Sequence, residues 1–169
     1  AGFGIHCGFI WRGVNLPENR HVIWEGSDGT EMVCYRFGRI GYCSFALQVR
    51  KAGQVLPHLT RKELEENLDA FIEEQKAAAD ASPLLLFDGC DHQGWDKEAY
   101  ALIQERIGKK DGEMRYIHSS LDAFAADLYA QRERITTRLC GELREPAIYP
   151  GGEDSQWLIP GVLSSRAWI

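Results

Sequence analysis

The sequence predicts an α/β domain with parallel strands and covering helices, preceded by a β-hairpin. The first half holds a strong hairpin signal, and the second half alternates helix, apolar run, helix, apolar run and helix. That alternation is typical of a parallel sheet covered by helices. The 169 residues are enough for one domain with a substantial core, and we expect a single unit over 1–169.

The strand signals come first along the chain. GIHCGFIWRGV, at 4–14, mixes aromatic and β-branched residues and stops at Asn-Leu-Pro, which predicts a strand. HVIWEGSDGTEMVCYRF, at 21–37, predicts two strands joined by a turn at 26–29. The Asp28–Gly29 pair in this turn is a strong signal for a β-hairpin.

Three helices are expected in the remainder. Thr60 is a natural N-cap with Glu63 three residues later, the spacing of a capping box, and apolar residues recur at helical intervals through 61–79. A second helix is expected at 97–107, where apolar residues share one side. The serines at 119–120 precede a third helical pattern, and one of them is expected to cap it.

Two short apolar runs separate these helices. LLLF, at 84–87, is of the kind found in a strand buried in a parallel sheet, and MRYIH, at 114–118, predicts another strand. Ligands in such folds gather at the carboxyl ends of the strands. We therefore expect the polar residues at 88–92 and 118–120 to lie on one rim. From 138 onward the chain is rich in Gly and Pro and predicts no regular element.

Composition excludes several classes of function. With 44% hydrophobic and 26% charged residues the chain is neither disordered nor fibrous. Its net charge of −6 gives no sequence-wide field favouring nucleic acid or an anionic membrane. No segment predicts a signal peptide or a membrane-spanning helix. Five cysteines at irregular spacings, without a CxxC pair, argue against a disulfide framework and favour a cytoplasmic location.

FDGCDHQGWD, at 87–96, crowds three aspartates into ten residues. Asp91 has two interpretations. As a functional acid it would exploit the rise in pKa that desolvation gives a carboxyl beside apolar residues. As part of a polar turn it would follow from Gly89 and Gly94, which allow left-handed backbone, with Asp96 capping the next helix.

Neighbouring residues suggest further chemistry. Cys90 and His92 could be a metal pair or a nucleophile with its base, although no second Cys/His pair at ligand spacing accompanies them. His118 before 119–120 suggests a hydrolase triad, but no G-x-S-x-G elbow is present and helix capping is the simpler reading. Trp95 could offer a sugar ring an aromatic face or could simply pack.

Several stretches together resemble the α-mannosidases of glycoside hydrolase family 38, particularly the bacterial branch. PLLLFDGCDHQG, at 83–94, resembles the strand and turn that deliver the family's acid/base. WLIPGVLSSRAW, at 157–168, is similar to a segment ending in Gly-x-x-[Ser/Thr]-Ser-Arg, and CGELR, at 140–144, to a stretch before it. The strand region at 4–37 resembles the part of the barrel that follows the nucleophile motif.

The resemblance implies a fold and a reaction. The chain would be the middle to C-terminal portion of a (β/α)7-barrel-like catalytic domain from a retaining, zinc-dependent α-mannosidase. Asp91 would be the acid/base aspartate, and α-mannosides would be the substrates. Cys43 stands where some members carry an aspartate. The substrate contacts that the resemblance implies are Tyr42, His92, Trp95 and Arg166.

The family's zinc-binding motifs and nucleophile are not found in these 169 residues. We therefore expect zinc only in the full-length parent, no metal ligand or cofactor in this fragment, and no hydrolysis by the fragment alone. Barrel edges left uncovered would favour self-association. Two alternatives remain: a non-catalytic α/β module that binds sugars or a protein through Trp95 and the rim, and a cysteine enzyme using Cys90 with His92.

Overall fold

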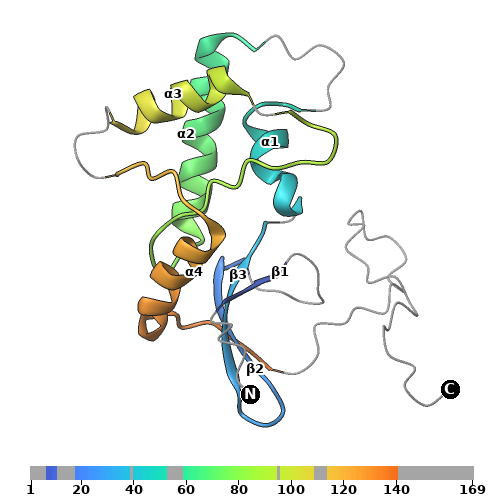
Figure 1. Ribbon diagram of the computed structural model, residues 1–169, viewed down its shortest axis with the longest axis vertical. Helices are drawn as coiled ribbons and strands as arrows, with labels where there is room; N and C mark the ends of the chain where they lie inside the picture. Colours follow the sequence, from blue (N-terminus) through green and yellow to red (C-terminus); the bar gives the residue numbers. More distant parts are fainter. Residues whose placement is uncertain are drawn as a thin grey trace, which may run out of the picture.

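The computed structural model describes residues 7–10, 18–38, 40–52, 59–94, 96–108 and 114–140. They form an α/β arrangement in which a four-stranded mixed sheet packs beside helices (Figure 1). The strands are β1 (Cys7–Ile10), β2 (His21–Glu25), β3 (Glu31–Arg36) and β4 (Arg138–Cys140). The α-helices are α1 (Ser44–Gln48), α2 (Arg61–Ala77), α3 (Lys97–Gly108) and α4 (Leu121–Ala130), with 3-10 turns at η1 (Gly41–Cys43) and η2 (Arg132–Arg134).

The sheet has the order β1-β3-β2-β4, with β2 and β3 antiparallel and both outer pairs parallel. The predicted hairpin is confirmed. Its turn is closed by the Gly26 N–H donating to the Thr30 carbonyl at 2.8 Å, and Asp28 Oδ1 accepts from the Thr30 N–H at 2.9 Å. Gly29 has φ 80°, a conformation that favours glycine. The sequence did not predict β4.

Local capping signals define the helices. Both bonds of the capping box between Thr60 and Glu63 are present at the start of α2. Asp96 Oδ1 accepts from two backbone N–H groups at the start of α3, each at 3.0 Å. The Ser120 hydroxyl accepts from the Ala123 N–H at the start of α4. All three predicted helices are therefore confirmed, whereas α1 was not predicted.

The prediction of strands at 84–87 and 114–118 is wrong for these residues. Neither run has regular secondary structure, and Leu84 to Leu86 are only half-buried. An apolar run becomes a strand only where a neighbour supplies a hydrogen-bonding ladder. Here the run packs by its side chains alone, with Leu85 against the core beside the sheet and Leu86 against the core between the helices.

Two groups of elements result. The sheet half, made of β1 to β4 and α4, is built around cores that include Ile23, Val33 and Leu128. The helical half, made of α1, α2 and α3, is built around Phe45 and Leu68. No helix within the described segments has both the length and the apolar composition needed to cross a bilayer.

Candidate functional site

The candidate site is built on a contact between Tyr42 and Asp91. The Tyr42 hydroxyl donates to Asp91 Oδ1 at 2.9 Å, although 49 residues separate them in sequence. Tyr42 lies in η1, just before α1, and Asp91 lies in the turn that follows 84–87. Folding thus joins two residues that the sequence analysis selected from unrelated stretches.

Next to both Tyr42 and Asp91, the backbone adopts a left-handed conformation. Gly41 has φ 84°, and its N–H donates to the Gly38 carbonyl at 2.8 Å, so the chain turns sharply just before Tyr42. In the turn after Asp91, His92 has φ 60°. A side chain in this left-handed region costs about 1–2 kcal/mol, and such strain tends to gather at functional sites.

Electrostatics keep the tyrosine protonated. The hydrogen bond to Asp91 raises the pKa of Tyr42 above its ordinary value of 10, with smaller contributions from burial and from the carboxylate charge. Tyr42 therefore acts as a donor to the carboxylate. Asp91 itself is exposed, so the apolar surroundings expected for a desolvated acid are not found here.

An arginine that the sequence analysis missed anchors the same turn. Arg50 donates to Asp88 Oδ1 from Nε at 3.0 Å and from Nη2 at 2.7 Å. The Arg50 side chain is only 9% exposed, whereas Asp88 lies at the surface, so this ion pair is shielded from water mainly on its arginine side. Because the two are 38 positions apart in the sequence, no local sequence signal could have paired them.

The predicted rim of strand ends does not form here, because 84–87 and 114–118 are not strands. Asp88 lies close enough to Tyr116 for its charge to help raise the pKa of that phenol to about 12, after burial and a hydrogen bond to Tyr100. Tyr100 also hydrogen-bonds His118 Nδ1 at 3.0 Å. The charged turn and the polar end of 114–118 are therefore linked through Tyr116. Ser120 serves as the cap of α4, which supports the simpler reading of the serines.

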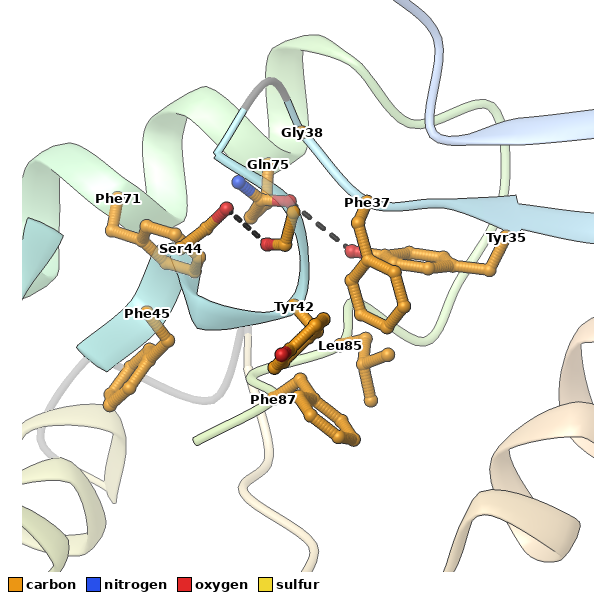
Figure 2. A pocket seen from close by; sticks show the side chains of 11 residues that line it. Tyr35, Phe37, Gly38, Tyr42, Ser44, Phe45, Phe71, Gln75, Leu85 and Phe87 are labelled. Atoms are coloured by element: carbon orange, nitrogen blue, oxygen red, sulfur yellow. Dashed lines mark hydrogen bonds between the residues drawn. The ribbon is translucent and has the colours of Figure 1, made fainter. Parts of the chain in front are cut away.

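A small pocket lies behind Tyr42. Its volume of about 10 Å³ is room for one water molecule. Figure 2 shows Tyr42 and Phe87 at one side and Phe45 and Phe71 at another. The remaining lining residues are Tyr35, Phe37, Gly38, Gly41, Ser44, Gln75 and Leu85. The pocket as it stands is too small for a sugar ring.

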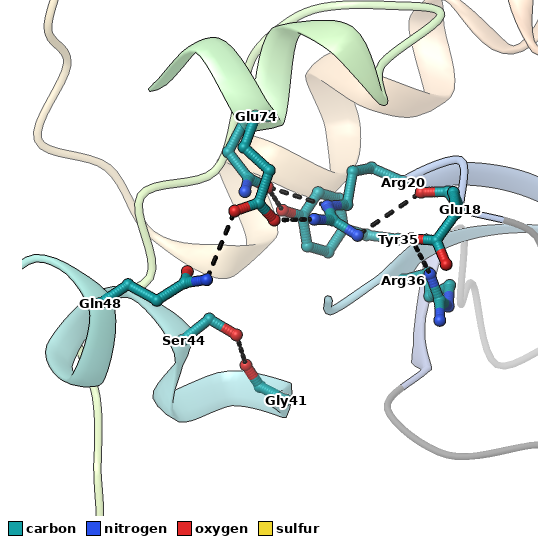
Figure 3. A network of polar contacts seen from close by, with 9 residues as sticks. Glu18, Arg20, Tyr35, Arg36, Gly41, Ser44, Gln48 and Glu74 are labelled. Carbon is teal, nitrogen blue, oxygen red and sulfur yellow. Dashed lines mark hydrogen bonds and ion pairs between the residues drawn. The ribbon is translucent and has the colours of Figure 1, made fainter. Parts of the chain in front are cut away.

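A buried polar network joins the sheet half to α2 beside this pocket (Figure 3). Arg20 donates from Nε to Gln75 Oε1 at 3.0 Å and pairs through Nη2 with Glu74 at 2.6 Å. The Tyr35 hydroxyl donates to the same Gln75 oxygen at 3.3 Å. Burial raises the pKa of Tyr35 to about 12, so this phenol also stays protonated.

The other selected residues have varied positions. His92 is exposed in the turn, next to Asp91. Cys90 is a free, half-buried thiol in the same turn. Trp95 and Arg166 lie outside the described residues. Within the described ranges, no three His, Cys, Asp or Glu side chains gather as a metal site.

Comparison of the chain with protein-family models, with curated protein sequences and with solved structures finds no match. The functional argument therefore depends on the site itself and on the sequence motifs.

Proposed function

We propose that this chain is part of a retaining, zinc-dependent α-mannosidase in which Asp91 is the acid/base carboxyl and Tyr42 is its hydrogen-bonding partner. The observation that carries the proposal is the 2.9 Å hydrogen bond between Tyr42 Oη and Asp91 Oδ1. The resemblance to glycoside hydrolase family 38 selects both residues independently of any structure. Their contact across 49 residues supports a shared site.

The geometry suits a carboxyl that both gives and takes a proton. In a retaining mechanism the acid first protonates the departing glycosidic oxygen and then accepts a proton from the attacking water. With Oδ1 of Asp91 engaged by Tyr42, Oδ2 is the oxygen that carries the proton. The phenol O–H donates to this carboxylate, the group that the mechanism needs to activate water. Exposure of the turn leaves Asp91 accessible to substrate.

The proposal also includes the barrel-like fold and the zinc ion of the full-length parent. In the full-length parent, 84–87 and 114–118 would become strands of a (β/α)7-barrel-like domain once neighbours supply their ladders. The half-burial of Leu84 to Leu86 supports this assignment. The described residues do not provide a zinc ligand set, so no step is assigned to the metal here.

The test uses the full-length parent with an α-mannoside that has a poor leaving group. Asp91→Asn should lower kcat by about 10²- to 10⁴-fold, because protonation of the leaving group is lost. Tyr42→Phe should lower it by about tenfold, the effect of removing one hydrogen bond to a charged group. An activated aryl α-mannoside has a leaving group that departs without being protonated. Asp91→Asn should therefore lower the rate of the first step much less with this substrate.

Asp122→Asn is the matched control, since Asp122 is an exposed aspartate in the first turn of α4. Unchanged turnover by a folded Asp91→Asn enzyme would remove Asp91 from the acid/base role. Mannose binding by the fragment itself, with no hydrolysis by the parent, would favour a carbohydrate-binding module instead.

A further inference from the structure

Two side chains from opposite ends of α1 hold the turn that carries Asp91. Tyr42 lies in η1, just before α1, and donates to Asp91 Oδ1 at 2.9 Å. Arg50 lies shortly after α1 ends and donates to Asp88 Oδ1 at 2.7 and 3.0 Å. One short helical segment therefore contacts the turn at two points, three residues apart.

We propose that Arg50 is a positioning residue for the candidate site: by binding Asp88, it holds the turn where Asp91 meets the Tyr42 hydroxyl. The structural part of this inference, control of the contact between Tyr42 and Asp91, does not depend on the proposed function. Its effect on catalysis rests on that function, because the effect acts through the acid/base role of Asp91.

The backbone beside Arg50 is fixed by the core of the helical half. Phe45 and Val49 are each 1% exposed and lie in the core that α1 shares with α2. The Val49 carbonyl also accepts from Nδ2 of Asn67 in α2 at 3.2 Å. Because close-packed cores leave side chains little room to move, Arg50 extends from a rigid base.

The turn after Asp88 gains little from packing. Its residues 91–94 are exposed where the structure describes them, and its backbone bond from the Gln93 N–H to the Cys90 carbonyl is 3.3 Å long. Segments with few buried contacts open at low cost in free energy. The position of this turn therefore depends on the side-chain contacts of Asp88 and Asp91.

The ion pair has the chemistry of a positioning contact. Nε and Nη2 of Arg50 both donate to Asp88 Oδ1, so two charge-assisted hydrogen bonds hold one carboxylate oxygen. The guanidinium is largely buried, which limits competition from water for these donors. Because both bonds end on a single oxygen, a lysine ammonium could replace them with one bond of its own. Lysine is therefore the conservative replacement at this position.

The first arm of the test measures the pKa of Tyr42 in the chain of 1–169, by carbon-13 NMR of labelled tyrosine, with Tyr42→Phe assigning the signal. The hydrogen bond to Asp91 raises this pKa above the ordinary value of 10. Arg50→Met should return it toward 10, because the contact with Asp91 is lost. Removing a nearby cation would by itself raise the pKa of a phenol, so a fall identifies the lost contact rather than the lost charge.

The matched control is Arg106→Met, which breaks an ion pair with Asp69 between α3 and α2. It should leave the pKa of Tyr42 unchanged, and Arg50→Lys should keep much of the parent value. Asp88→Asn repeats the test from the other partner, and adding Arg50→Met to it should cause little further change. The parent pKa for Tyr42 in folded Arg50→Met or Asp88→Asn chains would overturn the proposal.

The second arm uses the full-length parent. With a poor leaving group, Arg50→Met should lower kcat by about 10- to 10²-fold and leave KM nearly unchanged, because a displaced acid weakens only the transition state. An activated aryl α-mannoside should show a much smaller loss, as for Asp91→Asn, whereas a smaller folded fraction would lower both rates equally.

Equal losses with the two substrates would overturn the catalytic effect of Arg50. Arg106→Met should keep the parent rate with both substrates. A parent without mannosidase activity would count against the proposed function alone, because the NMR arm tests the contact between Tyr42 and Asp91 without any substrate.

Discussion

The sheet half buries several charged or titratable side chains, whereas the helical half carries its charged side chains on the surface. In the sheet half, Arg20, His21 and Arg36 are buried, with exposed fractions of 3%, 0% and 5%. In the helical half, charged side chains such as Arg61 pair on the surface of α2 and α3. Buried polar groups feel a low dielectric and titrate with large shifts, whereas surface pairs are screened by water and salt. Acidification should therefore lower stability mainly by protonating buried groups of the sheet half.

The largest expected effect tests whether the two halves unfold together. Leu68 in α2 and Leu128 in α4 are both fully buried, one in each half. Each change to Ala should lower the free energy of unfolding by about 2–5 kcal/mol, through lost burial and the cavity left behind. Because Arg20 ties the sheet to α2, each variant should shift one common urea transition. Hydrogen exchange that loosens only the mutated half would show that the halves are independent.

The next prediction concerns how stability depends on pH through a buried group of the sheet half. Burial lowers the pKa of His21 from 6.5 to about 4 in the folded state. The unfolded chain then binds more protons between these values, so stability should fall as the pH drops from 6.5 to 4. The contribution of His21 is about 3 kcal/mol. Protonation would also remove the acceptor at Nδ1, which receives the Ala81 N–H at 3.3 Å.

Urea unfolding at several pH values measures this contribution. His21→Asn keeps an acceptor but cannot titrate, so its stability should depend less on pH in this window. His118→Asn, at an exposed histidine, is the control and should retain the dependence of the parent chain. An equal slope for the parent chain and His21→Asn would contradict the buried, neutral state of His21.

The smallest effect compares one cap in each half. Thr60→Ala at α2 and Ser120→Ala at α4 should each lower the free energy of unfolding by about 1 kcal/mol, since each leaves a backbone N–H without its side-chain acceptor. Thermal unfolding followed by circular dichroism measures both. Ser119→Ala is the matched control for Ser120 and should change stability less, because the Ser119 hydroxyl bonds to the Ser120 carbonyl and caps no helical N–H in the described residues.

Sequence reasoning succeeded where the signal was local. The Asp28–Gly29 turn, the Thr60 capping box and the Asp96 cap each depend on residues within four positions of one another. It failed at 84–87, because an apolar run shows that side chains are buried but does not show which neighbour pairs with the backbone. The anchoring of Asp88 by Arg50 was missed for the same reason.

The residues of the candidate site were predicted from the sequence, but their contact and exposure were not. Motif resemblance selected Tyr42 and Asp91, yet no sequence spacing shows that they touch. The exposure of Asp91 was not foreseen, because the run before it was expected to lie deep in a sheet.

The guanidinium of Arg20 also sets the rotation of α2 about its own axis. Glu74 and Gln75 are consecutive on that helix and therefore point about 100° apart. Arg20 engages both of them, from Nη2 and from Nε. An apolar helix face alone would tolerate some rolling against the core, but turning α2 in either direction would pull one of the two acceptors away. One planar side chain thus gives α2 a defined angular setting, and Gln75 keeps its place beside the pocket behind Tyr42.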